Sequence, residues 1–131
     1  MCDIVLYVRQ YAARYITKNI STKEEKMDVQ MKRGLLEVCV LRSLYDSESY
    51  GYQIIKDVSP YVSISESTLY PILRRLEASS LVSVRSAEHN GRLRKYYRIT
   101  ALGVNKLNAF INEWKEINTI YRYVTEGGRT V

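Results

Sequence analysis

Apolar residues recur at steps of three and four along most of this chain, which is the spacing of one helix face. The first clear run predicts a helix over residues 32–45 from Leu35, Leu36, Cys39, Val40 and Leu44. A shorter run predicts a second helix over residues 50–57, with Tyr52 and Ile55 buried and Ile54 at the edge.

Two residues at the start of this second helix need an explanation. Ser49 is expected at the N-cap, because a serine oxygen there can accept a free backbone N–H. Gly51 costs the helix roughly 1 kcal/mol against alanine. A close approach by another backbone would explain this glycine.

The third predicted helix follows Ser65, its expected N-cap, and has two distinct faces. At 100° per residue, the apolar face holds Leu69, Ile72, Leu73 and Leu76. The opposite face holds Ser67, Tyr70, Pro71 and Arg74, with Arg75 at the flank. Hydroxyls, an aromatic ring and two guanidinium groups indicate a binding face, whereas an ordinary solvated helix would tolerate glutamate and lysine there.

Strand-like segments follow, over residues 81–85 and 93–99, joined by residues 86–92. Asn90-Gly91 is a strong turn signal because both residues tolerate positive φ. Alternation in the second strand puts Leu93, Tyr97 and Ile99 on one face and Arg94, Tyr96 and Arg98 on the other. His89 lies at the tip of this hairpin and is expected to be solvated.

A long final helix is predicted from its cap, Thr100, to about residue 124, before the glycines at 127 and 128. Its apolar seam steps alternately by 3 and 4 residues through Leu107, Phe110, Trp114, Ile117, Tyr121 and Val124. A period of 3.5 is typical of helices that pair with another helix. We therefore predict dimerisation through this seam; the alternative is that the seam packs within one chain.

The net charge of +6 is unevenly distributed along the chain. Residues 64–99 carry seven basic side chains against three acidic ones, so this segment alone contributes +4. The excess falls on the third helix and the hairpin. A helix followed by a basic hairpin is how a winged helix-turn-helix grips duplex DNA, where the cations meet phosphates. A merely solvated basic face is the alternative.

Other chemistry finds little support in the sequence. One histidine and two cysteines without a Cys-x-x-Cys pair give no zinc site. With no phosphate-binding glycine loop and no nucleophile–base pair, we predict no catalytic residue, metal or cofactor, and no enzyme. No apolar run approaches the ~18 residues of a membrane span, so we expect a cytoplasmic protein without membrane contact.

Four motifs, taken in order, resemble the PadR-type transcriptional regulators, specifically the short subgroup with one C-terminal helix. The matching segments are Arg33–Leu36, Tyr50–Ile55, Thr68–Glu77 and Gly91–Thr100, with Gly103. The resemblance runs from about Met31 to Val124. It implies a mainly α fold with a small β-hairpin, a winged helix-turn-helix that acts as a dimeric repressor on a near-palindromic operator in double-stranded DNA.

The resemblance also assigns roles by position. On the third helix the DNA-facing residues are Ser65, Ser67, Thr68, Tyr70 and Arg74, with Arg75 beside them. On the hairpin, or wing, they are Arg92, Arg94 and Lys95. Some short members respond to small aromatic or cationic compounds, and a tryptophan in their last helix helps to line a pocket at the dimer interface. Trp114 stands at a similar place, and we expect it to form an effector site together with Phe110. The rival is a winged-helix protein-interaction module without DNA binding, which predicts neutral or acidic residues at these cationic positions.

Three segments are thus expected: residues 1–26, a DNA-binding domain over 27–99, and a dimerisation helix with its tail over 100–131. Residues 4–20 have helical spacing, and residues 21–26 are polar and linker-like. Residues 23–27 can be encoded by a purine-rich bacterial ribosome-binding sequence that ends at a methionine codon. Residues 1–26 are therefore either a native arm or read-through upstream of a start at Met27 or Met31.

Overall fold

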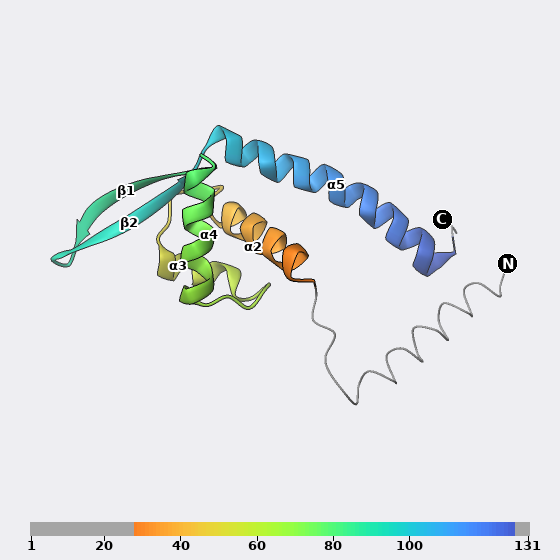
Figure 1. Ribbon diagram of the computed structural model, residues 1–131, viewed down its shortest axis with the longest axis horizontal. Coiled ribbons are helices and arrows are strands. Elements are labelled where there is room, and N and C mark those ends of the chain that lie inside the picture. The colour runs from red at the N-terminus through yellow and green to blue at the C-terminus, as the bar shows by residue number, and fades with distance from the viewer. Residues whose placement is uncertain (1–27, 128–131) are drawn as a thin grey trace, which may run out of the picture. The chain divides into compact units, whose positions relative to one another are not determined.

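The computed structural model describes residues 28–127 of the chain. Its elements are α2 (Val29–Ser43), α3 (Gly51–Val58), α4 (Glu66–Ala78), β1 (Val82–His89), β2 (Arg92–Ile99) and α5 (Ala101–Glu126) (Figure 1). This order confirms the predicted mainly α fold with one hairpin. The helix expected over residues 4–20, the linker after it and the tail beyond 127 lie outside the described residues.

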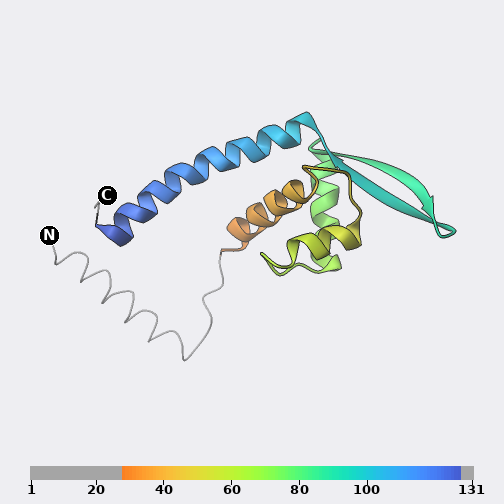
Figure 2. The ribbon, with the colours of Figure 1, turned by 180° about the vertical axis from the view of Figure 1, so that it is seen from behind.

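The described residues fall into two units, Val29–Ile111 and the end of α5 from Asn112 onward. In the first unit α2, α3 and α4 lie close together (Figure 2), and their buried side chains form one apolar core. Its fully buried side chains are Val40, Leu41, Leu44, Ile54, Leu69, Ile72, Leu73 and Leu76. The predicted apolar face of α4 is confirmed, because all four of its residues are in this list.

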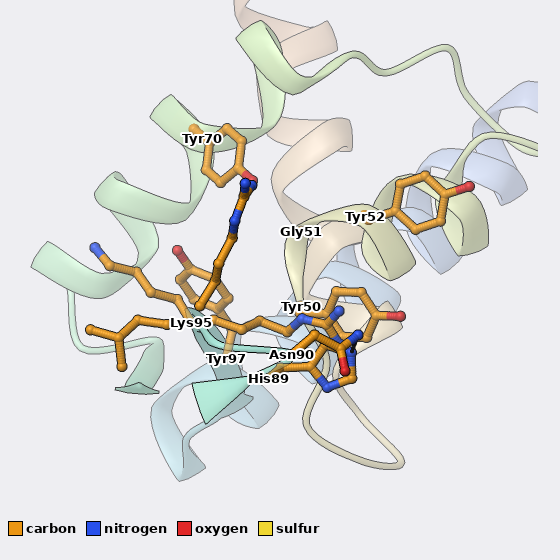
Figure 3. A pocket seen from close by; sticks show the side chains of 11 residues that line it. Tyr50, Gly51, Tyr52, Tyr70, His89, Asn90, Lys95 and Tyr97 are labelled. Atoms are coloured by element: carbon orange, nitrogen blue, oxygen red, sulfur yellow. Dashed lines mark hydrogen bonds between the residues drawn. The ribbon is translucent and has the colours of Figure 1, made fainter. Parts of the chain in front are cut away.

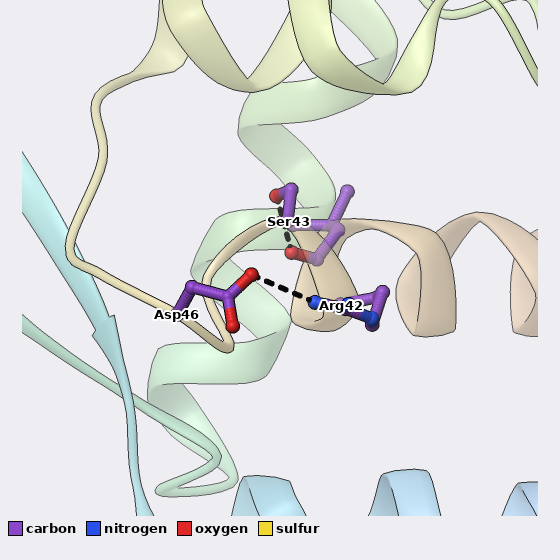
Figure 4. A network of polar contacts seen from close by, with 4 residues as sticks. Arg42, Ser43 and Asp46 are labelled. Atoms are coloured by element: carbon purple, nitrogen blue, oxygen red, sulfur yellow. Dashed lines mark hydrogen bonds and ion pairs between the residues drawn. The ribbon is translucent and has the colours of Figure 1, made fainter.

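The end of α2 differs slightly from the prediction. The helix stops at Ser43 instead of continuing to residue 45. The Ser43 hydroxyl donates to the Val40 carbonyl over 2.6 Å, and Arg42 pairs with Asp46 at 3.3 Å (Figure 4). Cys39 is half-buried against the core, and this burial raises the pKa of its thiol.

The prediction for α3 was wrong about which face is buried. Ile54 is fully buried and Tyr52 is 64% exposed. The buried stripe is Gly51, Ile54 and Val58, which has the same helical spacing as the predicted pair of Tyr52 and Ile55. A glycine carries no apolar side chain, so hydrophobicity alone favoured the wrong one of two equivalent stripes.

Ser49 is not the N-cap of α3, because Tyr50 occupies that position and makes no side-chain capping bond. The buried Ser49 pairs with β2 instead. Its N–H donates to the Tyr97 carbonyl over 3.0 Å, and the Tyr97 N–H donates to the Ser49 carbonyl over 2.7 Å. A serine three residues before an apolar run can either cap a helix or pair with the edge of a sheet. For Ser49 the backbone hydrogen bonds to Tyr97 favoured pairing with the sheet.

The hairpin is longer than predicted. Its strands pair antiparallel from Val82 opposite Ile99 to His89 opposite Arg92. Only Asn90 and Gly91 form the turn, with φ of 51° and 78°, as the turn signal predicted. The predicted connection over residues 86–92 is too long, because residues 86–89 pair with β2 through the backbone, and such pairing needs no apolar alternation.

The start of α5 is fixed to the first unit. Thr100 caps it as predicted, since its Oγ1 accepts the Gly103 N–H at 3.2 Å. A Cβ on Gly103 would overlap the carbonyl oxygen of Leu81, so this position requires glycine. The helix ends at Glu126, and Gly127 follows with φ of 66°. None of the described helices is both long and apolar enough to cross a bilayer.

Candidate nucleic-acid interface

A groove of about 770 Å³ lies between α4, the start of α3 and the hairpin (Figure 3). Tyrosines and cations dominate its lining, which comprises Tyr50, Gly51, Tyr52, Tyr70, His89, Asn90, Arg92, Leu93, Arg94, Lys95 and Tyr97. All three predicted wing residues are in this set. The third helix and the wing therefore border one common surface, which we call the groove.

The outer face of α4 presents hydroxyl, aromatic and cationic groups to solvent. Ser67, Tyr70 and Arg74 are all exposed, as their predicted position opposite the core requires. At the helix start the Ser65 Oγ lies 3.0 Å from the Ser67 Oγ and 3.2 Å from the Thr68 Oγ1. Three predicted contact residues thus form one cluster of hydroxyls.

The cluster changes the role expected for Ser65. This residue occupies the N-cap position of α4, but its side chain caps no backbone N–H. Its carbonyl accepts the Leu69 N–H at 2.9 Å, while its hydroxyl is engaged with the other two hydroxyls. The predicted N-cap position of Ser65 is confirmed, but its hydroxyl makes no capping bond, because neighbouring hydroxyls compete for the same oxygen.

Tyr70 explains the glycine at the start of α3. A Cβ on Gly51 would lie 2.8 Å from the Tyr70 Oη and 3.2 Å from its Cζ. The predicted close approach exists, but it comes from a side chain and not from another backbone. The Tyr70 side chain therefore lies against the start of α3. It remains 43% exposed and lines the groove.

Arg75 is placed differently from the other predicted contact residues. Its Nε lies 3.1 Å from the Glu37 Oε1 of α2, and the Glu37 side chain is only 18% exposed. This guanidinium joins two helices of the core unit instead of lining the groove. Helical spacing could not reveal this, because the carboxylate comes from a distant part of the chain.

The inner part of the wing carries a stack of cations and rings. The Arg94 Cζ lies 3.9 Å from the centroid of the Tyr50 ring. Tyr50 and Tyr96 meet edge to face at 6.0 Å, and the Arg85 Cζ lies 4.6 Å from the Tyr96 centroid. Arg92 and Lys95 of the same strand as Arg94 are exposed.

The stack ends in an ion pair at the base of the wing. The Arg85 Nε donates to the Glu48 Oε2 over 2.9 Å, and the Arg85 Nη2 contacts the second carboxylate oxygen. This hydrogen bonding lowers the pKa of Glu48, helped by the charges of Arg85 and Arg98. On the core side of β2, burial raises the pKa of Tyr97.

The sequence patterns gave no contact role to Tyr50, Tyr96 or Arg85, and of these three only Tyr50 lines the groove. One signal was available, since a two-residue turn at Asn90-Gly91 fixes the register and places Arg85 opposite Tyr96. No comparable signal existed for Tyr50, which precedes α3. Tyr50 is far from the wing in sequence and contacts it only because the two segments pack together.

The predicted seam of α5 divides into two parts. Leu107, the first residue of the seam, is 5% exposed and belongs to the core of its own chain. For this residue the alternative prediction, packing within one chain, is the correct one. Phe110 and Trp114 are half-buried. Ile117, Tyr121 and Val124 are 43%, 63% and 49% exposed.

Comparisons with known proteins show the family of this chain. Residues 40–109 match the model of the transcriptional regulator PadR-like family. The chain is 35% identical over 100 residues to an uncharacterized protein of Lysinibacillus sphaericus, covering 72% of this chain and 92% of that protein.

Two solved structures are similar in both sequence and fold. The protein smu.1704 of Streptococcus mutans is 36% identical with a TM-score of 0.66, covering 76% of this chain and 93% of that one. A PadR-like transcription factor of Bacteroides fragilis is 34% identical with a TM-score of 0.66, covering 72% and 94%. The chain belongs to the PadR-like transcriptional regulator family, whose members regulate transcription and are not enzymes.

Proposed function

We propose that this protein is a sequence-specific DNA-binding regulator, a homodimeric repressor that a small molecule releases from its operator. One observation carries the proposal: α4 and the wing present Tyr70, Arg92, Arg94 and Lys95 around a single groove. Their cations would neutralise phosphates, while the outward residues of α4 would reach base edges in the major groove.

The two groups of contacts have separable roles under this proposal. Arg74 extends from the exposed face of α4, where a guanidinium can bond a guanine edge in bidentate fashion. Lys95 extends from the wing, where an ammonium contacts a phosphate and carries no sequence information. Arg74 would therefore contribute specificity and Lys95 only affinity.

A gel shift on the upstream region of the protein's own gene, compared with random DNA, tests this division. Arg74→Ala should weaken operator binding by ~1–3 kcal/mol and random DNA much less. Lys95→Ala should weaken both alike. If a dimer neutralises roughly 8 phosphates, log K should fall with log salt at a slope near −7. Arg42→Ala, an exposed arginine outside the groove, is the control; equal losses for Arg74→Ala on both DNAs contradict the proposal.

We further propose that residues 100–131 mediate dimerisation beside a DNA-binding domain of residues 27–99. The support is the exposed apolar side chains of α5, which include Ile117, Ile120, Tyr121, Tyr123 and Val124. A second copy of the same helix would cover them. The two reading heads would then meet near-palindromic half-sites about one helical turn apart, or a multiple of it.

Sedimentation equilibrium tests the dimer. The double variant Ile117→Asp/Tyr121→Asp should sediment as a monomer, because two carboxylates cannot be buried unpaired. Its circular dichroism should retain the wild-type helix content, since both side chains are exposed within the chain. A wild-type protein that stays monomeric at micromolar concentration contradicts the proposal.

The effector would bind at Phe110 and Trp114, which offer flat apolar surface on α5. A ligand releases DNA only if it favours one placement of the two reading heads over another. Titration of the tryptophan fluorescence with aromatic cations and phenolic acids measures such binding. Fluorescence unchanged across the whole panel contradicts this part of the proposal.

A further inference from the structure

Three consecutive residues connect the wing to the helices. The backbone of Ser49 pairs with Tyr97 of β2. The ring of Tyr50 lies under Arg94 of the same strand. The hydroxyl of Tyr70, from α4, occupies the space where a side chain on Gly51 would lie. This short segment, residues 49–51, therefore touches both elements that border the groove.

Within this segment, the contact between Tyr50 and Arg94 is the closest of its kind among the described residues. The Arg94 Cζ lies 3.9 Å from the ring centroid, which is stacking distance, and the other cation–ring distances run from 4.6 to 6.0 Å. Both residues are half-buried and line the groove. A guanidinium whose carbon lies over a ring face keeps N–H groups that can still donate to an acceptor.

No carboxylate in residues 28–127 forms an ion pair with Arg94, whereas Arg42, Arg75, Arg85 and Arg122 each have one. The pair of Arg42 and Tyr45 shows the difference. Arg42 also lies over a tyrosine, at 5.2 Å, but its guanidinium is paired with Asp46 (Figure 4). Among the arginines of residues 28–127 that lie over a tyrosine ring, only Arg94 forms no ion pair, and it lines the groove.

An arginine loses considerable side-chain freedom when it is fixed by a ligand. A ring that already holds the guanidinium removes part of that loss before binding. We infer that Tyr50 is a positioning residue that pre-orients the Arg94 guanidinium for a phosphate of duplex DNA. This inference rests on the proposed DNA-binding function, and it assigns to Tyr50 no contact with DNA of its own.

The test measures binding to a random-sequence duplex of about 30 base pairs over a range of KCl concentrations, because phosphate contacts do not depend on sequence. Tyr50→Leu should weaken binding about 3- to 10-fold with an unchanged salt slope, since Arg94 keeps its charge. Tyr50→Phe keeps the ring and should bind like wild type. Tyr45→Leu, the matched tyrosine under Arg42, should also bind like wild type.

Variants of Arg94 complete the test and do not depend on the folding of Tyr50→Leu. Arg94→Lys keeps the charge but not the stacking plane, so it should resemble Tyr50→Leu. Arg94→Gln should reduce the salt slope by about 0.9 per protomer. Adding Tyr50→Leu to Arg94→Gln should cause no further loss, because the two residues act through one contact.

A second readout needs no DNA. In the free protein the ring current of Tyr50 should shift the Arg94 Nε–H resonance. This shift should remain in Tyr50→Phe and disappear in Tyr50→Leu. If wild type binds duplex DNA with the expected slope while Tyr50→Leu binds equally well, or loses affinity additively with Arg94→Gln, the inference fails alone. If wild type binds no duplex, the proposed function fails and the inference with it.

Discussion

The two sides of α4 differ in almost every physical respect. On one side Leu69, Ile72 and Leu73 are at most 2% exposed within the apolar core. On the other side Tyr70 and Arg74 are exposed, and Tyr70 borders the groove. The inward side of α4 therefore contributes to stability, and its outward side is available for binding. Substitutions on the inward side should change the free energy of unfolding, and those on the outward side should change DNA affinity.

Leu73→Ala should produce the largest effect and mark the core side. Its side chain is 1% exposed, so truncation removes buried methyl groups and leaves a cavity. The free energy of unfolding should fall by about 2–5 kcal/mol, measured by urea denaturation. DNA affinity of the folded fraction should remain near wild type, and a selective loss of affinity without destabilisation would break the separation.

Gly51→Ala should produce the converse result on the groove side. The new Cβ would lie 2.8 Å from the Tyr70 Oη, so the flexible tyrosine side chain must move. We expect a loss of DNA affinity of about 1–2 kcal/mol and a change in unfolding free energy below about 1 kcal/mol. Adding Tyr70→Phe removes the hydroxyl that clashes, and the double variant should then match Tyr70→Phe alone.

Two residues at helix starts provide a matched pair. The Thr100 Oγ1 accepts the Gly103 N–H and donates to the Ser80 carbonyl over 2.6 Å, so Thr100→Ala should cost ~1 kcal/mol of stability. The Ser65 hydroxyl caps nothing, so Ser65→Ala should leave the urea midpoint unchanged and weaken DNA binding instead. Equal destabilisation by both substitutions would contradict this assignment.

The smallest effect is expected at the base of the wing, where Glu48 pairs with Arg85. The pKa of Glu48 is lowered in the folded state, so the ionised pair stabilises the fold above the ordinary carboxyl pKa. That contribution disappears as pH falls through the lowered pKa. Glu48→Gln should therefore lower the melting temperature slightly at pH 7, and the difference from wild type should vanish once the pH is well below the ordinary carboxyl pKa.

Regular periodicity predicted the parts of the fold that depend on near neighbours in sequence. The apolar stripe of α4, the Asn90-Gly91 turn and the Thr100 cap were each predicted from a few adjacent residues, and each is confirmed. Local patterns succeed here because helix spacing and positive φ are properties of the chain itself.

The errors occurred where two local solutions were equally good. Residues 49–51 could have begun a helix with a serine cap and a buried Tyr52. Instead Ser49 joined β2 and Gly51 met Tyr70. Arg75, predicted beside Arg74 on the binding face, pairs with Glu37 of α2. Each of these outcomes depends on a partner from a distant segment.

The class of the protein, the apolar face of α4 and the segment that concentrates positive charge could all be predicted from the residues alone, since helical spacing and charge are properties of short stretches of chain. Three contacts could not: Tyr50 lies under Arg94, Tyr70 occupies the space above Gly51, and Leu107 belongs to the core of its own chain. Such contacts join side chains that are far apart in sequence, so they exist only after the intervening elements have packed.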